Sequence, residues 1–204
     1  MAGIDPARVR ANLERVREQI GDAVEICAAI KYVAARDLPA LAEAGIGLVG
    51  ENRAQELVAK QEEHGPLFEW DFIGALQSRK VKDVAPRVRL IHTVASDSAL
   101  AQLGKHPAAE VLIQVNVVGE GGKAGIAPDE LGEFIARCPV PVTGLMTMPP
   151  LAERPEESRP HFARLAELAA EHGLERLSMG TSQDYEAAVA EGATIVRLGS
   201  VLYD

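Results

Sequence analysis

TIVRLGSVLYD, which spans residues 194–204, decides the fold that this sequence predicts. Its first five residues are apolar or β-branched apart from Arg197, which is typical of a buried strand. It is the last of eight stretches of this kind, and segments with the spacing of amphipathic helices lie between them. The eight predicted strands are 24–30, 47–49, 69–73, 90–93, 111–117, 140–145, 176–179 and 194–198.

The alternation of strands and helices indicates that the strands pair in parallel. Many of the strands are nearly continuous apolar runs, as expected where both faces of a sheet are covered. Eight strands are the number that a closed barrel requires, whereas a doubly wound sheet usually has about five or six. We therefore predict an α/β chain that folds as a single TIM-type (β/α)8 barrel in one domain, residues 1–204. Helices are expected at 38–44, 53–63, 78–85, 97–103, 128–136, 156–171 and 183–190.

One more helix is expected ahead of the first strand, because Val9, Leu13, Val16 and Ile20 recur at helical spacing. Only a few residues follow the eighth strand, which leaves no room for an eighth outer helix after it. We expect the N-terminal helix to fill that place on the outside of the barrel.

The composition is that of a globular protein with a sizeable core, since 47% of the residues are hydrophobic. The net charge of -9 argues against a nucleic-acid partner, which would call for a basic surface. The two cysteines are expected to be buried free thiols, and neither has a second cysteine at metal-binding spacing. No apolar run reaches the ~18 residues that span a membrane, so a cytoplasmic protein is expected. A monomer is expected because no surplus amphipathic helix is evident.

Lys31 directly follows the first apolar stretch, VEICAAI. In barrels of this kind the functional face lies at the C-terminal ends of the strands, so a polar residue there is a candidate. A lysine at this place is expected to be partly desolvated, which favours its neutral amine as a nucleophile toward a carbonyl, as in a Schiff base. The alternative is an ordinary strand-end lysine whose ammonium reaches solvent.

Small and hydroxylated residues accompany the last two predicted strands. The loops after strands seven and eight of such barrels often bind phosphate through backbone N–H groups and hydroxyls. Arg197 lies within an apolar run, so it must find a partner and could face a ligand at the barrel mouth. Ordinary turns and a structural arginine are the alternative. The residues concerned are Ser178, Gly180, Thr181, Ser182, Gly199 and Ser200.

An amine at the first strand and a phosphate site at the last two strands together favour a phosphorylated aldehyde. Pyridoxal phosphate is the common ligand of this type. Asn52, in GENRAQE after the second strand, could line the site or cap the next helix. His92 ends the fourth strand, and the sequence identifies no partner for it.

The sequence resembles the YggS/PROSC family of pyridoxal phosphate homeostasis proteins over nearly its whole length. Several of the matching segments are long, so chance agreement is very improbable. The resemblance implies a barrel like the N-terminal domain of alanine racemase, which is a type III fold for pyridoxal phosphate. The segments are AAIKYVAARDL around Lys31, VGENRAQE at 49–56, FIGALQSRK at 72–80, VLIQVNVVGEGGKAG at 111–125, GLMTMPP at 144–150, LSMGTSQDYEAAVAEGAT at 177–194 and VRLGSVLY at 196–203.

The resemblance also implies roles for particular residues. Lys31 matches the lysine that forms the Schiff base, and Arg197 matches the arginine that faces the pyridine nitrogen. Asn52 matches a position that lines the cofactor. An arginine at the pyridine nitrogen disfavours protonation of that nitrogen and so weakens the ring as an electron sink. Phosphate-binding positions are matched by Ser178, Gly199 and Ser200, with the backbone of Gly180 and Thr181 beside them.

The sequence departs from the family pattern at four positions. Ile30 stands where Thr or Ser is common, which could loosen the site around the lysine. Asp71 and Ala75 replace two histidines, which is expected to remove polar groups near the barrel mouth. Thr181 replaces a methionine. The lysine, arginine and phosphate positions are intact, so cofactor binding is expected to survive.

The resemblance favours a protein that binds, buffers or delivers pyridoxal phosphate without robust catalysis, with apo enzymes that need this cofactor as partners. A racemase or aldolase is the alternative. Racemisation needs a second base, which alanine racemase takes from a further domain and a partner subunit, whereas this sequence ends at residue 204. Tyr32 and Tyr185 are the tyrosines near predicted strand ends that could serve instead. A third possibility is noncovalent binding of another phosphorylated metabolite.

Overall fold

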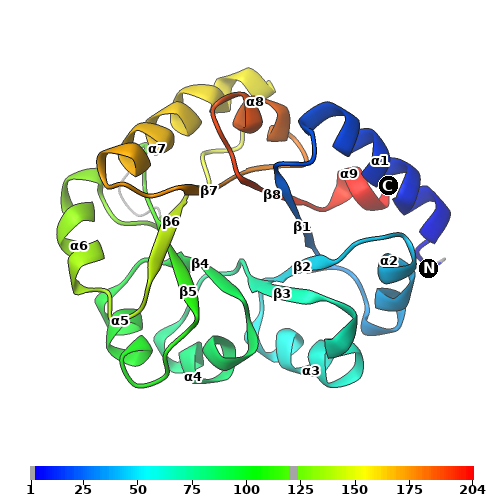
Figure 1. The fold of residues 1–204 in the computed structure, drawn as a ribbon, viewed down its shortest axis with the longest axis horizontal. Helices are drawn as coiled ribbons and strands as arrows, with labels where there is room; N and C mark the ends of the chain where they lie inside the picture. Colours follow the sequence, from blue (N-terminus) through cyan, green and yellow to red (C-terminus); the bar gives the residue numbers. More distant parts are fainter. Residues whose placement is uncertain (1–2, 120–123) are drawn as a thin grey trace.

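Eight strands close into a parallel barrel. The computed structural model describes residues 3–119 and 124–204. Each strand pairs in parallel with its neighbour in sequence, and β8 pairs with β1 to complete the ring, which helices surround (Figure 1). The predicted TIM-type (β/α)8 barrel is therefore confirmed. The strands are β1 Glu25–Ala29, β2 Leu48–Glu51, β3 Glu69–Phe72, β4 Leu90–Val94, β5 Glu110–Gln114, β6 Val142–Met146, β7 Arg176–Thr181 and β8 Ile195–Leu198.

The helices between the strands lie close to their predicted positions. Those at 78–85, 128–136 and 156–171 each begin with a short 3-10 turn before the α-helix. Within the described ranges, no helix is both long enough and apolar enough to cross a membrane. The helices are α1 Pro6–Ile20, α2 Leu38–Glu43, α3 Ala54–His64, α4 Val81–Val84, α5 Asp97–Leu103, α6 Leu131–Arg137, α7 Arg159–Glu171, α8 Tyr185–Ala190 and α9 Ser200–Tyr203.

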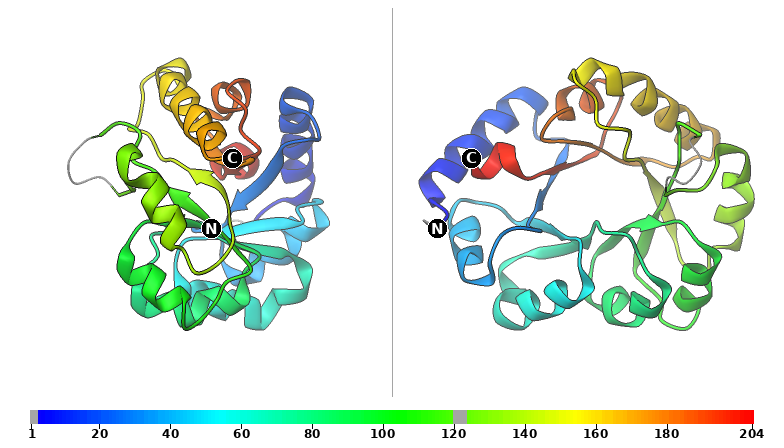
Figure 2. Two further views of the ribbon diagram at one scale, coloured as in Figure 1. Left: turned by 60° about the vertical axis from the view of Figure 1, so that its left-hand side comes forward. Right: turned by 180° about the vertical axis from the view of Figure 1, so that it is seen from behind.

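Helix α1 covers the gap where the chain returns to β1, as predicted. The Asn12 side chain donates to the carbonyls of Leu202 at 3.1 Å and Asp204 at 3.2 Å, which joins α1 to the last residues of the chain. The sequence left no room for a helix after β8, but α9 forms a single turn there. The two ends of the chain consequently lie on the same side of the barrel (Figure 2).

Two strands differ from their predicted bounds for local reasons. The apolar run at 111–117 predicts a longer strand than β5, which stops at Gln114. Beyond it, Val115 makes only an isolated bridge to Ile126 as the chain leaves the barrel. The run at 140–145 predicts an earlier start than Val142, where β6 begins. Pro141 precedes that residue and has no N–H to donate to a neighbouring strand. Residues 120–123 of the family-like segment 111–125 lie outside the described residues.

The apolar residues form two separate clusters on the two sides of the strands. The larger one fills the layer between the barrel and the helices. The smaller one consists of residues from five different strands and fills the inside of the barrel, where Leu48 and Ile73 pack against it. Its members are Cys27, Leu90, Leu112, Met146 and Ile195. Side chains alternate along a strand, so further residues in the same phase also point into the barrel.

The pairing of β8 with its neighbours places the candidate residues at one end of the barrel. Arg197 pairs with Cys27 on β1 and with Thr181 on β7. Lys31 follows Cys27 by four residues, so it lies further toward the C-terminal end of the barrel than Arg197. The C-terminal ends of parallel strands share one face, and this face therefore carries the candidate site.

Candidate functional site

Arg197 is buried near the end of β8 and lacks a carboxylate partner at ion-pair distance within the described residues. Its Nη1 donates to Ser178 Oγ at 2.6 Å, and its Nη2 donates to the Thr147 carbonyl at 3.1 Å. Burial lowers the pKa of Arg197 to about 10, since desolvation disfavours the charged form. Burying a guanidinium without a counter-charge is costly, which makes Arg197 a candidate donor to an acceptor on a ligand.

The cavity that Arg197 lines has a volume of about 460 Å³. The loop after β6 forms its other wall, and the exposed side chain of Met148 in that loop lies with its sulfur 3.5 Å from Arg197 Nη2. Gly180 and Thr181 line the same cavity, so the structure brings three of the predicted site residues together. Gly180 has a φ of 89°, and a Cβ there would lie 2.6 Å from Ala188.

Thr181 uses both of its donors within the chain. Its N–H and its hydroxyl donate to Asp184 Oδ1 at 2.7 and 3.0 Å, which fixes the turn into α8. Asp184 also lines the cavity, and a carboxylate repels a phosphate. A phosphate group at Thr181 would therefore have to displace these hydrogen bonds and would face the Asp184 carboxylate.

Two backbone donors converge on one acceptor at the end of β8. Ser182 Oγ accepts from the N–H of Gly199 at 3.0 Å and from the N–H of Val201 at 3.4 Å. The two amides thus point at one oxygen beside Ser200, which begins α9. The sequence placed Ser182 among the hydroxylated residues of these loops, but the family resemblance assigned it no phosphate-binding position.

Ser178 contacts other side chains of the barrel in this structure, and the phosphate role that the resemblance implies for it stays a prediction. Its side chain is fully buried inside the barrel, and its Oγ lies 2.8 Å from His92 Nδ1 as well as 2.6 Å from Arg197 Nη1. These contacts use the hydroxyl for the arginine rather than for a phosphate. We therefore assign Ser178 to the support of Arg197.

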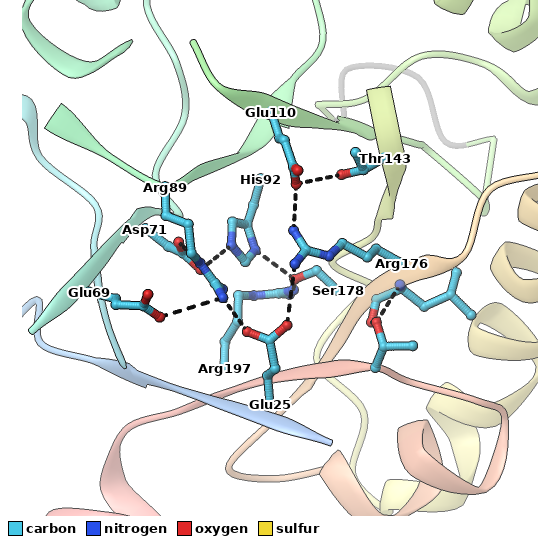
Figure 3. A network of polar contacts seen from close by, with 12 residues as sticks. Glu25, Glu69, Asp71, Arg89, His92, Glu110, Thr143, Arg176, Ser178 and Arg197 are labelled. Carbon is cyan, nitrogen blue, oxygen red and sulfur yellow. Dashed lines mark hydrogen bonds and ion pairs between the residues drawn. The ribbon is translucent and has the colours of Figure 1, made fainter. Parts of the chain in front are cut away.

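His92 has two partners, although the sequence identified none. Its Nδ1 faces Ser178, and its Nε2 lies 3.0 Å from Asp71 Oδ2 (Figure 3). Asp71 in turn accepts from Arg89 at 3.1 Å and 2.9 Å, one bond on each oxygen. The expectation that position 71 lies near the barrel mouth is wrong. The side chain is fully buried inside the barrel, on the side of His92 away from Arg197.

Burial and charge act against each other in this network. Burial lowers the pKa of His92 and outweighs the opposite effect of Asp71, so His92 is held neutral. Burial alone would raise the pKa of Asp71, but the hydrogen bonds from His92 and Arg89 lower it below its usual range. The network therefore contains an ionised Asp71 beside a neutral His92.

A second tier of ion pairs closes the N-terminal end of the barrel. Arg89 Nη1 lies 2.6 Å from Glu25, and Arg176 lies 2.7 Å from Glu110 and 3.6 Å from Glu25 (Figure 3). These side chains stand at the start of their strands or, for Arg89, just before it, and they are half-buried to exposed, so solvent screens them. Among them Arg89 supplies the counter-charge of Asp71 from this end of the barrel.

Lys31 is exposed, with its Nζ 4.9 Å from the centre of the Tyr32 ring. The expected partial desolvation is therefore not provided by the chain itself. Lys31, Gly199 and Ser200 are not among the residues that line the cavity of Arg197. Tyr32 is 86% exposed beside the lysine. Tyr185, the other tyrosine of the racemase alternative, donates to Gln19 on α1 at 2.6 Å and so lies outside the barrel.

A buried ion pair supports the segment that leads to Lys31. Lys60 Nζ donates to Glu51 Oε2 at 2.6 Å and to the carbonyl of Ile30 at 2.9 Å. The other carboxylate oxygen of Glu51 accepts from the N–H groups of Asn52 at 2.7 Å and Arg53 at 3.2 Å. The pair thus fixes the residue before Lys31 and the turn that holds Asn52.

Asn52 does not cap the helix that follows it. The N-cap of α3 is Arg53, and it makes no side-chain capping bond. Asn52 Oδ1 is buried and has no hydrogen-bond partner among residues 3–119 and 124–204. Asn52 lines a second cavity of about 270 Å³, which also contains Gln77 and Arg79, rather than the cavity of Arg197. An orphaned buried oxygen of this kind points to a missing partner, which supports a lining role.

The residues present fit pyridoxal phosphate on three observations. Arg197 offers a donor without a carboxylate partner in the described ranges, the amides of Gly199 and Val201 point at one acceptor, Ser182 Oγ, and Asn52 Oδ1 has no partner in those ranges. An arginine can only donate, and a pyridine nitrogen that carries no proton can accept. The ring nitrogen would therefore lie at Arg197 and the phosphate at the end of β8.

Comparison with known proteins agrees with this barrel. The family profile described as alanine racemase, N-terminal domain, matches residues 4–204, which defines the class. The pyridoxal phosphate homeostasis protein of Aquifex aeolicus is 38% identical over 97% of this chain and 95% of its own length. That of Pseudomonas aeruginosa is 40% identical over 78% of this chain and 75% of its own. The chain belongs to the alanine racemase N-terminal domain family and, within it, to the YggS/PROSC group.

Solved structures give the same result. PipY of Synechococcus elongatus PCC7942, solved with PLP bound, is 31% identical, has a TM-score of 0.84 and covers 96% of this chain and 100% of its own. Alanine racemase of Clostridium difficile 630 is 16% identical, with a TM-score of 0.76 over 98% of this chain and 57% of its own, and shows the fold alone. The resemblance seen in the sequence is confirmed at the level of family and fold.

Proposed function

We propose that this chain binds pyridoxal phosphate and acts in its homeostasis, as the names of its relatives state for them. The observation that carries the proposal is Arg197, a buried guanidinium that lines a cavity without a counter-charge among the described residues. PipY, which is similar over its whole length, was solved with the same cofactor. Residues 1–204 would serve as one binding domain.

We assign each part of the cofactor to residues of the chain. Lys31 would hold the aldehyde carbon as a Schiff base, and one water would leave as the bond forms. Arg197 would donate to the ring nitrogen, and the phosphate would replace Ser182 Oγ as the acceptor of the Gly199 and Val201 amides, with the Ser182 hydroxyl as a further donor. Asn52 would complete the lining, with Ser178 behind Arg197. The bound cofactor supplies an electron-accepting ring, which an arginine at its nitrogen weakens.

An exposed Schiff-base lysine suits a cofactor carrier better than an enclosed lysine does. Lys31 lies in solvent at the barrel mouth, so a second amine or water can reach the bond that it forms. Release of the cofactor then needs no large movement of the barrel. We propose on this ground that the chain exchanges the cofactor with apo enzymes that require it. We also propose that it is a monomer, on the separate ground that its sequence shows no surplus amphipathic helix.

The test is the absorption spectrum of the protein with added pyridoxal phosphate, followed by borohydride reduction and peptide mass mapping. We expect a Schiff-base band and one reduced adduct on Lys31. Lys31→Ala should lose both, and the matched variant of an exposed lysine on α4, Lys82→Ala, should keep both. An adduct spread over several surface lysines, or no band, would refute the assignment. Size-exclusion chromatography with light scattering checks the monomer.

A further inference from the structure

A line of four hydrogen-bonded side chains crosses the inside of the barrel from β8 to β3 (Figure 3). Arg197 contacts Ser178 at 2.6 Å, Ser178 contacts His92 at 2.8 Å, and His92 contacts Asp71 at 3.0 Å. All four are at most 6% exposed. The line comes from β8, β7, β4 and β3, and so joins strands on opposite parts of the ring.

The chemistry of the four groups sets the direction of every hydrogen bond. An arginine can only donate, so Ser178 Oγ accepts from Arg197. Asp71 accepts from Arg89 on both oxygens and is ionised, so it also accepts from His92 Nε2. His92 then carries its proton on Nε2, and its bare Nδ1 accepts from the Ser178 hydroxyl.

We propose that Asp71 and His92 are positioning residues, which act through Ser178 to fix the guanidinium of Arg197 toward the cofactor ring. The carboxylate of Asp71 selects the tautomer of His92, and that tautomer turns the Ser178 hydroxyl away from Arg197. The oxygen of Ser178 is then always available as an acceptor. The identity of the group that Arg197 faces rests on the proposed function. The hydrogen-bonded line from Asp71 to Arg197, called the relay below, does not.

The opposite tautomer would break the line. With its proton on Nδ1, His92 would donate to Ser178 from one side while Arg197 donated from the other. The hydroxyl hydrogen of Ser178 would then lose its acceptor inside a buried site, which is unfavourable. Asp71, which stands where the family commonly has a histidine, excludes this arrangement because a carboxylate cannot donate.

The relay can be tested in the cofactor-free protein by ¹⁵N nuclear magnetic resonance. Nitrogen shifts of His92 report its tautomer, and resolved guanidinium resonances report whether Arg197 is held. The variants are Asp71→Asn and Ser178→Ala, and the second removes no buried charge and so keeps the test valid if the first fails to fold. Glu69→Gln is the matched control, because Glu69 is exposed and contacts the same Arg89 at 3.8 Å.

We expect the wild type to show the Nε2–H tautomer and a held Arg197 guanidinium. Both variants should free the guanidinium and weaken pyridoxal phosphate binding about tenfold, the loss of roughly one charged hydrogen bond, whereas Glu69→Gln should do neither. An Nδ1–H tautomer in the wild type, or an Arg197 equally held in both variants, would overturn the inference. A wild type that shows the relay but takes up no cofactor contradicts the proposed function alone.

Discussion

Replacing Lys60 by methionine tests how the buried ion pair holds the segment before Lys31. Lys60 is 2% exposed and Glu51 is fully buried, and their charged atoms are 2.6 Å apart. Methionine nearly matches the length of the lysine stem but has no charge. The variant therefore removes the donors to Glu51 and to the Ile30 carbonyl while leaving the packing largely unchanged.

The expected cost is about 3–5 kcal/mol of unfolding free energy, because the change leaves an unpaired carboxylate in the interior. Two observations place it within this range rather than above it. Glu51 keeps the two amide donors of Asn52 and Arg53, which partly stabilise its charge. The Ile30 carbonyl keeps the N–H of Val33 at 3.0 Å. A loss of this size is a large part of the stability of a typical domain.

Urea unfolding followed by circular dichroism measures this cost. The matched control is Lys82→Met, an exposed lysine whose loss should change the unfolding free energy by less than about 0.5 kcal/mol. The double variant Glu51→Gln with Lys60→Met neutralises the pair and should cost less than the sum of the two single variants, by about 1–3 kcal/mol. If Lys60→Met is as stable as Lys82→Met, the pair does not hold the segment and the reasoning fails.

Two more predictions concern stability. His92 has a lowered pKa in the folded state, so below about pH 6.5 the unfolded chain binds a proton at this histidine that the folded chain does not bind. The unfolding free energy should therefore fall, as the pH falls, by up to about 1.4 kcal/mol per pH unit. Urea unfolding between pH 7.5 and 5.5 should show a weaker decline in His92→Gln, and equal slopes would contradict the assignment. Gly74→Ala places a Cβ 2.0 Å from the Asn52 carbonyl oxygen and should lower the thermal unfolding midpoint strongly. Gly47→Ala is the control, because open space surrounds that position, and it should leave the midpoint unchanged. Similar midpoints for the two variants would exclude the close approach at Gly74.

The barrel could be predicted from the sequence because its signal is local. Each strand is an apolar run, and the count of eight selects the closed form over an open sheet. The bounds were less exact where a local effect intervened, as at Pro141 before β6. The single turn of α9 was missed because four residues are too few for helical periodicity to appear.

The site was predicted only in part because its decisive contacts join distant residues. Arg197 was singled out as a charge in an apolar strand, and the structure shows it buried and lining a cavity. Its partner Ser178, and the contact of Ser178 with His92, 86 residues away in sequence, depend on register across the barrel. The sequence showed the hydroxyl and the imidazole but not which strands would bring them together. Nothing in the sequence indicated that Lys60 is buried, since its helix has the pattern of an exposed one.

Prediction from the sequence also misplaced two residues relative to the barrel mouth. Lys31 ends an apolar run, and this predicted a shielded amine, but the chain turns outward there and exposes it. Asp71 was placed near the mouth from its position in a family motif, although its phase in β3 and its contact with Arg89 put it inside. Phase along a strand is thus the better guide to which side chains point into the barrel.

The pairing of β8 with β1 has a consequence for the order of events during synthesis. Arg197 pairs with Cys27, and the two are separated by 197 − 27 = 170 residues. A ribosome makes the chain from its N-terminus, so Lys31 emerges long before the arginine that would hold the other side of the ring. The barrel cannot close until β8 has left the exit tunnel. A nascent chain in which β8 is still enclosed would therefore offer the cofactor an amine but no complete binding site.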